Sequence, residues 1–240
     1  MDMEQWKEIL QEWMNKTAQQ LREIPIEQYL FGLFKRSKSD TILVAGLSGS
    51  GKTVLFYQLR DGSAHQGTVT SMDPNEGTFV LHSESSEKVK VCVVDVPGHS
   101  RLRPKLDEYL PQAAGLVFVV DALDFLPNCR AAAEYLFEIL TKATVVKKKV
   151  PVLIVCNKTD KVTAHTKEFI RKQLEKEIDK LRASRTAISA ADMSTEYALG
   201  VAGETFAFSQ CHNKVSVGES SGLTGDISHV EQFIREHVRS

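Results

Sequence analysis

The amino-acid sequence predicts an α/β domain with a mostly parallel, six-stranded sheet, one antiparallel strand at its edge and helices on both faces. The main observation is that apolar runs of strand length alternate with segments of helical periodicity. A glycine-rich motif also stands between the first strand and the first helix. The 240 residues suffice for one such domain and a short appendage, and 42% hydrophobic with 25% charged residues is ordinary for a folded chain.

The strands are predicted where short apolar runs are bounded by polar turns. In chain order they lie at 41–45, 78–82, 89–94, 115–120, 150–156 and 214–218. A short polar turn joins the second run to the third, which predicts that the second strand is the antiparallel one. The helical segments lie at 52–60, 101–110, 128–142, 164–183 and 226–238. Residues 184–206 have no period and are predicted to form a long loop.

Residues 1–38 differ from the domain predicted at 39–240 and form an N-terminal amphipathic and juxtamembrane segment. Its apolar side chains recur at helical spacing among charges of both signs, at Trp6, Leu10, Trp13 and Leu21. Docking on protein and weak contact with a membrane surface both remain open for this helix. The apolar residues 29–34 precede the basic residues 35–38, as at the cytosolic margin of a membrane anchor, but are too few to be the anchor.

Composition excludes some classes of function. The net charge of −1 argues against broad electrostatic capture of nucleic acid or acidic lipid. The four cysteines are scattered and are predicted to be reduced residues of a cytosolic protein: Cys92, Cys129, Cys156 and Cys211. No run of 18 apolar residues is present, and the N-terminus lacks the pattern of a secretory signal.

Residues 46–53 read GLSGSGKT and match the phosphate-binding pattern G-x-x-x-x-G-K-[ST] at every fixed position. The predicted strand before them and helix after them supply the setting that this P-loop pattern requires. The glycines let backbone N–H groups turn toward phosphate oxygens, and the helix N-terminus adds partial positive charge. Lys52 is expected to reach the β- and γ-phosphates, and the Thr53 hydroxyl to bind Mg²⁺. The predicted nucleotide-binding residues here are Ser48, Gly49, Ser50, Gly51, Lys52, Thr53 and Val54.

A D-x-x-G motif stands at 95–98, directly after the strand predicted at 89–94. Asp95 at the strand end is predicted to hold Mg²⁺ through water, and the Gly98 N–H to approach the γ-phosphate. Four residues are a weak match alone, but this position behind a P-loop strand makes the match specific. Ligands of doubly wound sheets lie at the carboxyl ends of strands, which is where both motifs fall.

An N-K-x-D motif at 157–160 follows the strand predicted at 150–156. A carboxylate at Asp160 can accept hydrogen bonds from the N1–H and exocyclic amine of guanine, and adenine offers no such donor pair. Lys158, which follows Asn157, is expected to lay its stem along the base and tie back to the P-loop. Ser221 and Gly222, after the last strand, are expected to bring N–H groups to the guanine oxygen. The three motifs together predict a P-loop NTPase G domain that binds GTP or GDP with Mg²⁺.

The loop around residues 67–72 is predicted to be a switch. One hydroxyl there would complete the Mg²⁺ coordination only when the γ-phosphate is present, with Thr70 as the first choice and Thr68 in reserve. Ordered loops at 64–77 and 97–106 would then present a docking surface, although each of its side chains could equally be internal packing. The surface comprises His65, Met72, Phe79, Leu102 and Leu106.

Hydrolysis is predicted to be slow. Lys52 and His99 are the candidate catalytic residues, and His99 follows D-x-x-G where related enzymes place a water-orienting glutamine. His99 could equally be a polar residue facing solvent. No Lys or Arg occurs between Arg60 and Lys88, so that loop cannot supply an arginine in cis. We expect an intrinsic rate on the order of 10⁻⁴ per second or below.

With these motifs in order, the sequence resembles small GTPases of the Arf/Sar-related branch, and within it the plant-type β subunits of the signal recognition particle (SRP) receptor. The resemblance covers residues 39–240 and includes the stretches 53–59, 95–99, 173–178 and 206–210. It implies a GTPase on the cytoplasmic face of the endoplasmic reticulum membrane. It further implies that the GTP-bound form holds the N-terminal domain of the receptor α subunit, so that ribosome–nascent chain complexes reach the translocon.

Three alternatives stay open at this point. A Sar/Arf-type GTPase that recruits a vesicle coat would share the P-loop and N-K-x-D, although Pro97 and the mixed charge of residues 1–21 speak against it. A P-loop kinase or ATPase would leave Asp160 without a purpose. A scaffold that holds GTP permanently and never cycles is the third, and the nucleotide content of the purified protein would separate it from a switch.

Overall fold

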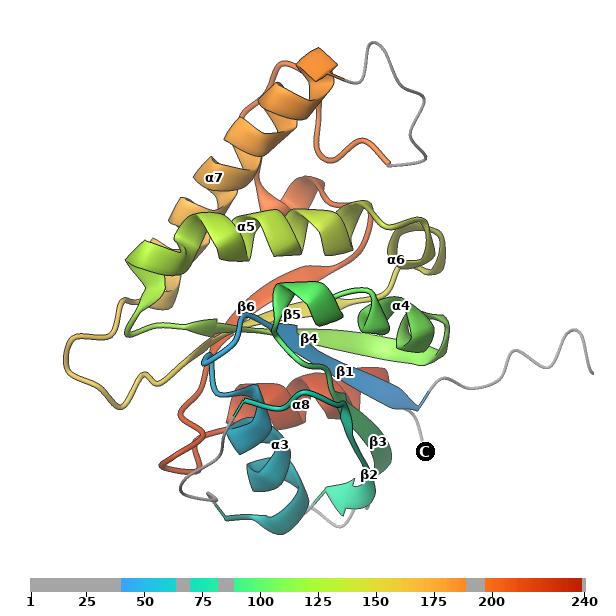
Figure 1. Ribbon diagram of the computed structural model, residues 1–240, viewed down its shortest axis with the longest axis vertical. Coiled ribbons are helices and arrows are strands. Elements are labelled where there is room, and N and C mark those ends of the chain that lie inside the picture. The colour runs from blue at the N-terminus through green and yellow to red at the C-terminus, as the bar shows by residue number, and fades with distance from the viewer. Residues whose placement is uncertain (1–39, 64–69, 82–88, 189–196, 239–240) are drawn as a thin grey trace, which may run out of the picture. The chain divides into compact units, whose positions relative to one another are not determined.

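The computed structural model, shown in Figure 1, describes residues 40–63, 70–81, 89–188 and 197–238. The chain divides into two compact units, Met1–Lys38 and Ser39–Ser240. The predicted N-terminal helix lies outside the described residues, as do His65 and Thr68. The described fold and the candidate site therefore both belong to the second unit.

The sheet has six strands in the order β2-β3-β1-β4-β5-β6, and every neighbouring pair is parallel except β2 with β3. The predicted fold class is thereby confirmed. The strands are β1 (Thr41–Gly46), β2 (Asn75–Leu81), β3 (Val89–Asp95), β4 (Ala113–Asp121), β5 (Val152–Asn157) and β6 (Val215–Glu219). The side chains of β5 are buried along its whole length, as expected of a central parallel strand, whereas those of β2 alternate between exposed and covered.

Helices cover both faces of the sheet (Figure 1). They are α3 (Lys52–Asp61), α4 (Lys105–Tyr109), α5 (Phe125–Thr141), α6 (Ala143–Lys148), α7 (Lys167–Ile188) and α8 (Ser228–His237). One apolar cluster joins α4, α5 and α7 to one face of the sheet, and a second joins α3 and α8 to the other face. Burial on both faces fixes the register of the central strands, and so it fixes where their carboxyl ends meet.

The single helix predicted at 101–110 is wrong. The chain instead forms the 3₁₀ turn η1 (Ser100–Leu102), the five-residue α4 and the 3₁₀ turn η2 (Leu110–Gln112). Pro104 immediately precedes α4, and Pro111 lies at the start of η2. Because proline lacks an N–H and its ring clashes with the preceding turn, these two residues divide the segment into short pieces.

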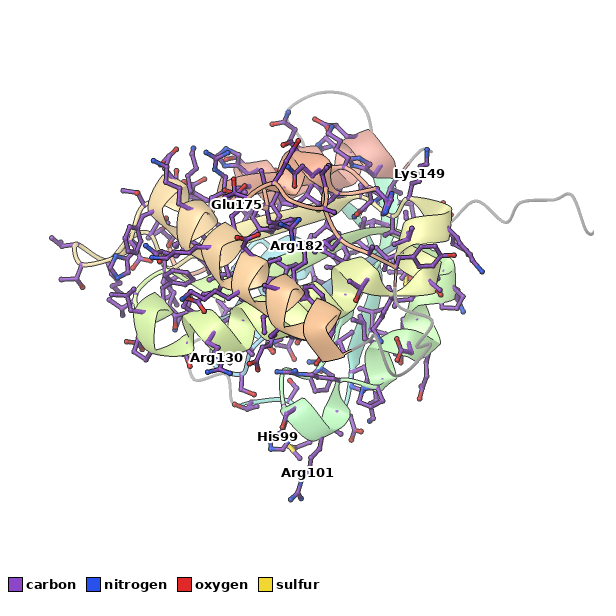
Figure 2. All side chains as sticks on the ribbon, turned by 90° about the horizontal axis from the view of Figure 1, so that it is seen from above. His99, Arg101, Arg130, Lys149, Glu175 and Arg182 are labelled. Carbon is purple, nitrogen blue, oxygen red and sulfur yellow. The ribbon has the colours of Figure 1, made fainter. Side chains whose placement is uncertain are left out.

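The loop predicted at 184–206 is also partly wrong, because α7 continues through Ile188. Residues that follow this helix in the chain pack back against it, because charged side chains of α7 form hydrogen bonds with their backbone groups. Arg182 donates to the carbonyl oxygens of Val201 and Glu204, while Glu175 accepts from the N–H of Phe208 at 3.0 Å. Arg182 and Glu175 lie along α7 in Figure 2. The returning segment then leads through η3 (Phe208–Gln210) into β6.

Candidate nucleotide-binding site

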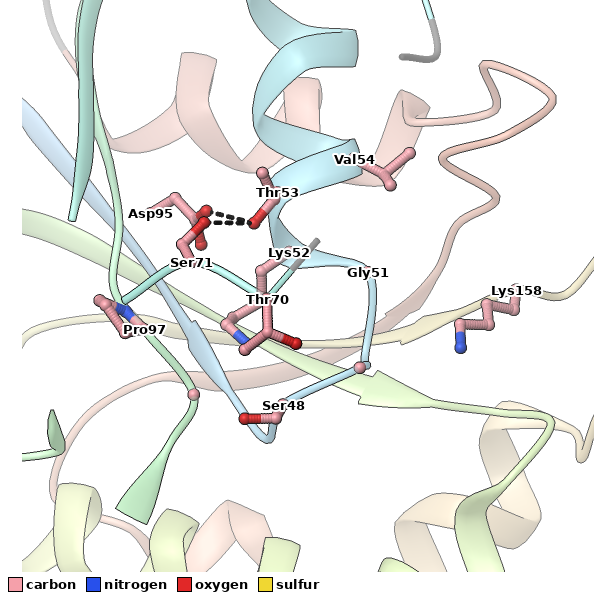
Figure 3. Close-up of a pocket in the computed structure, with 12 residues that line it drawn as sticks. Ser48, Gly51, Lys52, Thr53, Val54, Thr70, Ser71, Asp95, Pro97 and Lys158 are labelled. Atoms are coloured by element: carbon pink, nitrogen blue, oxygen red, sulfur yellow. Dashed lines mark hydrogen bonds between the residues drawn. The ribbon is translucent and has the colours of Figure 1, made fainter. Parts of the chain in front are cut away.

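The predicted site residues meet at the carboxyl ends of β1, β3 and β5. A cavity of about 230 Å³ opens there, with Asp95 on one side and Lys158 on the other (Figure 3). Its walls are Ser48, Gly49, Gly51, Lys52, Thr53, Val54, Thr70, Ser71, Asp95, Pro97, Gly98 and Lys158. The first and second motifs, which lie more than forty residues apart in the chain, are therefore parts of one cavity.

Two glycines allow the P-loop to approach other segments closely. Gly51 has a φ of 91°, and a Cβ there would stand 2.3 Å from the Asn157 amide nitrogen. A Cβ on Gly98 would stand 2.5 Å from the backbone nitrogen of Ser48. A side chain at either position would push the three motifs apart, so the glycines are what let the motifs form a single site.

Lys52 is buried at the floor of the cavity, where its ammonium donates to the carbonyl oxygen of Leu47 at 2.7 Å. Burial lowers the pKa of Lys52 to about 8, and the nearby charge of Asp95 opposes that shift. A carbonyl is a neutral partner and compensates a buried ammonium only in part. The site is therefore suited to an anion such as phosphate, which would stabilise the charged form of Lys52.

Asp95 forms a compact oxygen-rich cluster with the P-loop. Its Oδ2 accepts from the Thr53 hydroxyl at 2.6 Å and from the Asn75 amide at 3.1 Å (Figure 3 shows the first bond). Its Oδ1 is buried and has no partner among the described residues. Burial raises the pKa of Asp95, and the hydrogen bonds from Thr53 and Asn75 oppose that shift. A hydroxyl and a carboxylate with a buried spare oxygen fit a hard divalent cation such as Mg²⁺.

The switch loop brings Ser71 rather than Thr70 to this cluster. Ser71 Oγ lies 3.4 Å from Thr53 Oγ1 and accepts from Asn75 Nδ2 at 3.0 Å. Thr70 lines the cavity but is exposed. Sequence reasoning missed Asn75, which pairs opposite Asp95 in the register of β2 and β3. Asn75 lies 20 residues from Asp95 in the chain, and no local pattern indicates that register.

Asn157 ties three segments together behind the cavity. Its Nδ2 donates to the carbonyl oxygen of Ser50 at 2.9 Å, and its Oδ1 accepts from the Ser220 hydroxyl and the Gly222 N–H, both at 3.1 Å. The sequence analysis predicted that Lys158 would contact the P-loop, and that prediction is wrong, because Asn157 makes this contact. Lys158 instead donates to Asp121 at the end of β4.

Asp160 stands beside the loop after β6, as expected of a residue that reads a base together with that loop. Its Oδ1 accepts from the Ser221 hydroxyl at 2.8 Å, and its Oδ2 lies 3.0 Å from the Lys161 ammonium. The bonds from Lys161 and Ser221 lower the pKa of Asp160, so the carboxylate is ionised near neutral pH and acts only as an acceptor. The structure thus brings Ser221 and Gly222 to the N-K-x-D motif from 61 and 65 residues away.

Comparison with known proteins agrees with this geometry. A family profile described as the signal recognition particle receptor beta subunit matches residues 37–215. The mouse SRP receptor subunit beta is 34% identical over 211 residues, covering 83% of this chain and 77% of that protein. The chain belongs to the family of SRP receptor β subunits. Its sequence likeness extends more weakly to an ADP-ribosylation factor, at 28% identity over 62% of this chain.

Solved structures place the chain in the same family fold. A structure of the mammalian SRP receptor matches with a TM-score of 0.69 and 31% identity, covering 82% of this chain and 98% of that one. A complex described as SRb-GTP/SRX from Chaetomium thermophilum matches with a TM-score of 0.66, covering 83% of this chain and 100% of that one. At 19% identity, the second match speaks for the fold alone.

The candidate catalytic residue of this SRP receptor β-family chain, His99, does not line the cavity. It is exposed and projects away from the body of the domain beside Arg101 (Figure 2). Its Nδ1 accepts from the Arg101 N–H at 3.3 Å and so caps η1. A catalytic role for His99 stays a prediction, and it requires the imidazole to turn from this position toward the P-loop.

The docking surface expected from the sequence is only partly exposed. Met72 is 62% exposed, whereas Leu106 is fully buried in the apolar core against one face of the sheet. Leu106 is therefore wrong as a docking residue, because α4 turns it toward the sheet. Phe79 is half-buried and packs against Phe56 with the two rings nearly perpendicular. Among the residues that the structure describes, no helix is long and apolar enough to cross a bilayer.

Proposed function

We propose that this chain is the GTP-binding subunit of an SRP receptor, and that it captures the receptor α subunit through that subunit's N-terminal domain while GTP is bound. The proposed place of action is the cytoplasmic face of the endoplasmic reticulum membrane, reached directly or through a partner. The ribosome and the translocon are further candidate partners, and no nucleic acid is expected. The observation that carries the proposal is the single cavity lined by Lys52, Asp95 and Lys158. The Asp160–Ser221 pair belongs to the same N-K-x-D turn as Lys158.

Guanine selection is assigned to the end of the site around Asp160. The ionised carboxylate, oriented by Ser221, would accept from the two donors on the guanine edge. An adenine nucleotide would leave the charge unpaired, which is costly wherever water is excluded. Asn157 keeps this end in register with the P-loop through Ser50, so the base and the phosphates are held at a fixed separation.

Phosphate and metal binding are assigned to the other end. The P-loop N–H groups and Lys52 would hold the phosphates, while Thr53 and Asp95 would hold Mg²⁺, with Thr70 as the predicted switch ligand. When bound, the ion neutralises charge on the phosphate oxygens. The Ser71–Asn75–Asp95 hydrogen bonds connect the switch loop to the metal side of the site. Whether that loop is ordered would therefore depend on whether GTP or GDP is bound.

Partner docking is assigned to the two loops beside the phosphate end, which polar side chains already connect. Lys105 on α4 pairs with Asp73 at 2.8 Å, and Tyr109 donates to Glu76 at 2.5 Å. A change in the loop around Thr70 would thus reach α4 directly. The neighbouring Met72 supplies exposed apolar surface for a partner.

Hydrolysis is assigned the role of a slow reset. The first switch loop contains no arginine, and His99 does not line the cavity. An arginine contributes about 10³–10⁵ in rate where a related enzyme has one, so we expect hydrolysis by the isolated chain to be slow. A partner that turns His99 inward or supplies a cation would accelerate the reaction.

The test is calorimetry of nucleotide binding followed by capture of the α-subunit N-terminal domain. We expect GDP and GTP to bind with Mg²⁺ and ATP to bind far more weakly, and GTP-loaded protein alone to retain the α domain. Thr53→Asn and Lys52→Ala should abolish retention. Equal affinity for guanine and adenine nucleotides would refute the proposal, and retention without any nucleotide would refute the switch.

A further inference from the structure

Both the backbone and the ammonium of Lys158 are constrained. Its backbone has a φ of 69°, which is uncommon for a residue other than glycine. Its ammonium donates to Oδ2 of Asp121 at 2.5 Å. Asp121 is the last residue of β4 and lies opposite Asn157 in the parallel register of β4 and β5. The neighbouring strand therefore supplies a carboxylate that anchors the second residue of the N-K-x-D motif.

The Asp121 carboxylate is itself fixed. Its Oδ1 accepts from the backbone N–H groups of Leu123 at 2.9 Å and Asp124 at 3.1 Å, which leaves Oδ2 for the ammonium. The side chain of Asp121 is 13% exposed and that of Lys158 is 28% exposed. Removal of one partner from a partly desolvated pair leaves the other charge uncompensated, which costs more than breaking an exposed pair.

We propose that Asp121 is a positioning residue for guanine recognition, acting through Lys158. This inference rests on the proposed function. With its ammonium anchored at Asp121, the Lys158 stem is held at the wall of the cavity, where Figure 3 shows it opposite Asp95. A base stacked on that stem then meets a preformed surface, so less side-chain freedom is lost on binding. The Lys158 ammonium is paired with Asp121, whereas the cation beside Asp160 is Lys161.

The alternative is that the Asp121 carboxylate has only a structural role in the turn after β4, through its bonds to the Leu123 and Asp124 N–H groups. β4 and β5 are already joined by a continuous parallel ladder from Leu116 with Val152 to Asp121 with Asn157. Asp121 also retains its two backbone bonds without Lys158. The two explanations differ in one respect: a positioning role disappears when residue 158 has no ammonium, whereas a structural role does not.

The experiment is a double-mutant cycle on the full chain with Asp121→Asn and Lys158→Met, measured as the dissociation rate of fluorescent GDP in Mg²⁺. Asparagine preserves the acceptor for Leu123 and Asp124, and methionine preserves the stem. We expect Asp121→Asn to accelerate dissociation about tenfold in the natural background and less than about twofold in the Lys158→Met background. Melting temperatures of the nucleotide-free variants report any loss of fold.

Asp124→Asn is the matched control, because that side chain is exposed and makes no capping bond to α5. It should leave the dissociation rate unchanged. Equal acceleration by Asp121→Asn in both backgrounds, or none in the natural one, would overturn the positioning role while guanine binding stands. Failure of the natural chain to bind GDP would instead overturn the proposed function, so the two failures are distinguishable.

Discussion

The two ends of the nucleotide cavity are held in different ways. At the end expected to read the base, Asn157 and Ser220 are buried, and hydrogen bonds join β5, the P-loop and the loop after β6. At the switch end, contacts between the loops run through exposed side chains, such as Lys105 with an Asp73 that is 89% exposed. A buried polar group that loses its hydrogen bond costs free energy of folding, whereas an exposed ion pair contributes little to that free energy.

The contrast separates two tasks within one cavity. A base is the same in GDP and GTP, so the end that reads it gains from being rigid and preformed. The γ-phosphate is the only difference between the two nucleotides, and the end near it must rearrange at small energetic cost. The exposed contacts of α4 with Asp73 and Glu76 meet that requirement.

The largest effect on nucleotide affinity is expected from Asp160→Asn, which changes the rigid end of the site. An amide cannot accept both guanine donors as the carboxylate does, so GDP affinity should fall roughly a hundredfold or more. Affinity for xanthine nucleotides, which present the complementary edge, should rise. Competition calorimetry with GDP and XDP measures both, with Asp124→Asn as the control. A variant that retained full GDP affinity would show that Asp160 does not read the base.

An intermediate effect is expected from pH, acting on Lys52. Because the pKa of Lys52 is lowered to about 8, the free protein has lost part of this charge at pH 8.5, and a bound polyanion restores it. Binding should then take up roughly three-quarters of a proton at pH 8.5 and about a tenth at pH 7. Affinity should fall as pH rises above about 8. Calorimetry in buffers of different ionisation enthalpy measures the uptake, and equal uptake at both pH values would contradict this assignment.

The smallest effect is expected from the exposed contacts of the switch end. Tyr109→Phe removes the bond to Glu76, and Lys105→Met removes the pair with Asp73. Each should change GDP dissociation less than about threefold and leave the melting temperature nearly unchanged. Capture of the α domain should be more sensitive, because these contacts join the two loops that form the proposed docking surface. A large loss of nucleotide affinity would mean that this end is as rigid as the other.

Sequence patterns predicted the fold class and the motif positions because both are local. A P-loop is eight consecutive residues, and each strand is indicated by its own apolar run. The helix prediction failed where short elements meet, as around Pro104, since periodicity does not show where a helix is interrupted. The contribution of Ser71 and Asn75 was also missed, because their place beside Asp95 depends on strand pairing.

By itself, the sequence determined that a phosphate-binding loop, a D-x-x-G turn and an N-K-x-D turn follow three buried strands. Only the tertiary structure decided which side chains meet there: Asn75 with Asp95, Asp121 with Lys158, and Ser221 with Asp160. The physical reason is that parallel strands bring their carboxyl ends together whatever their separation in the chain, and that the antiparallel β2 places its first residue opposite the end of β3. Their register, set by burial on both faces of the sheet, then selects the partner of each polar group.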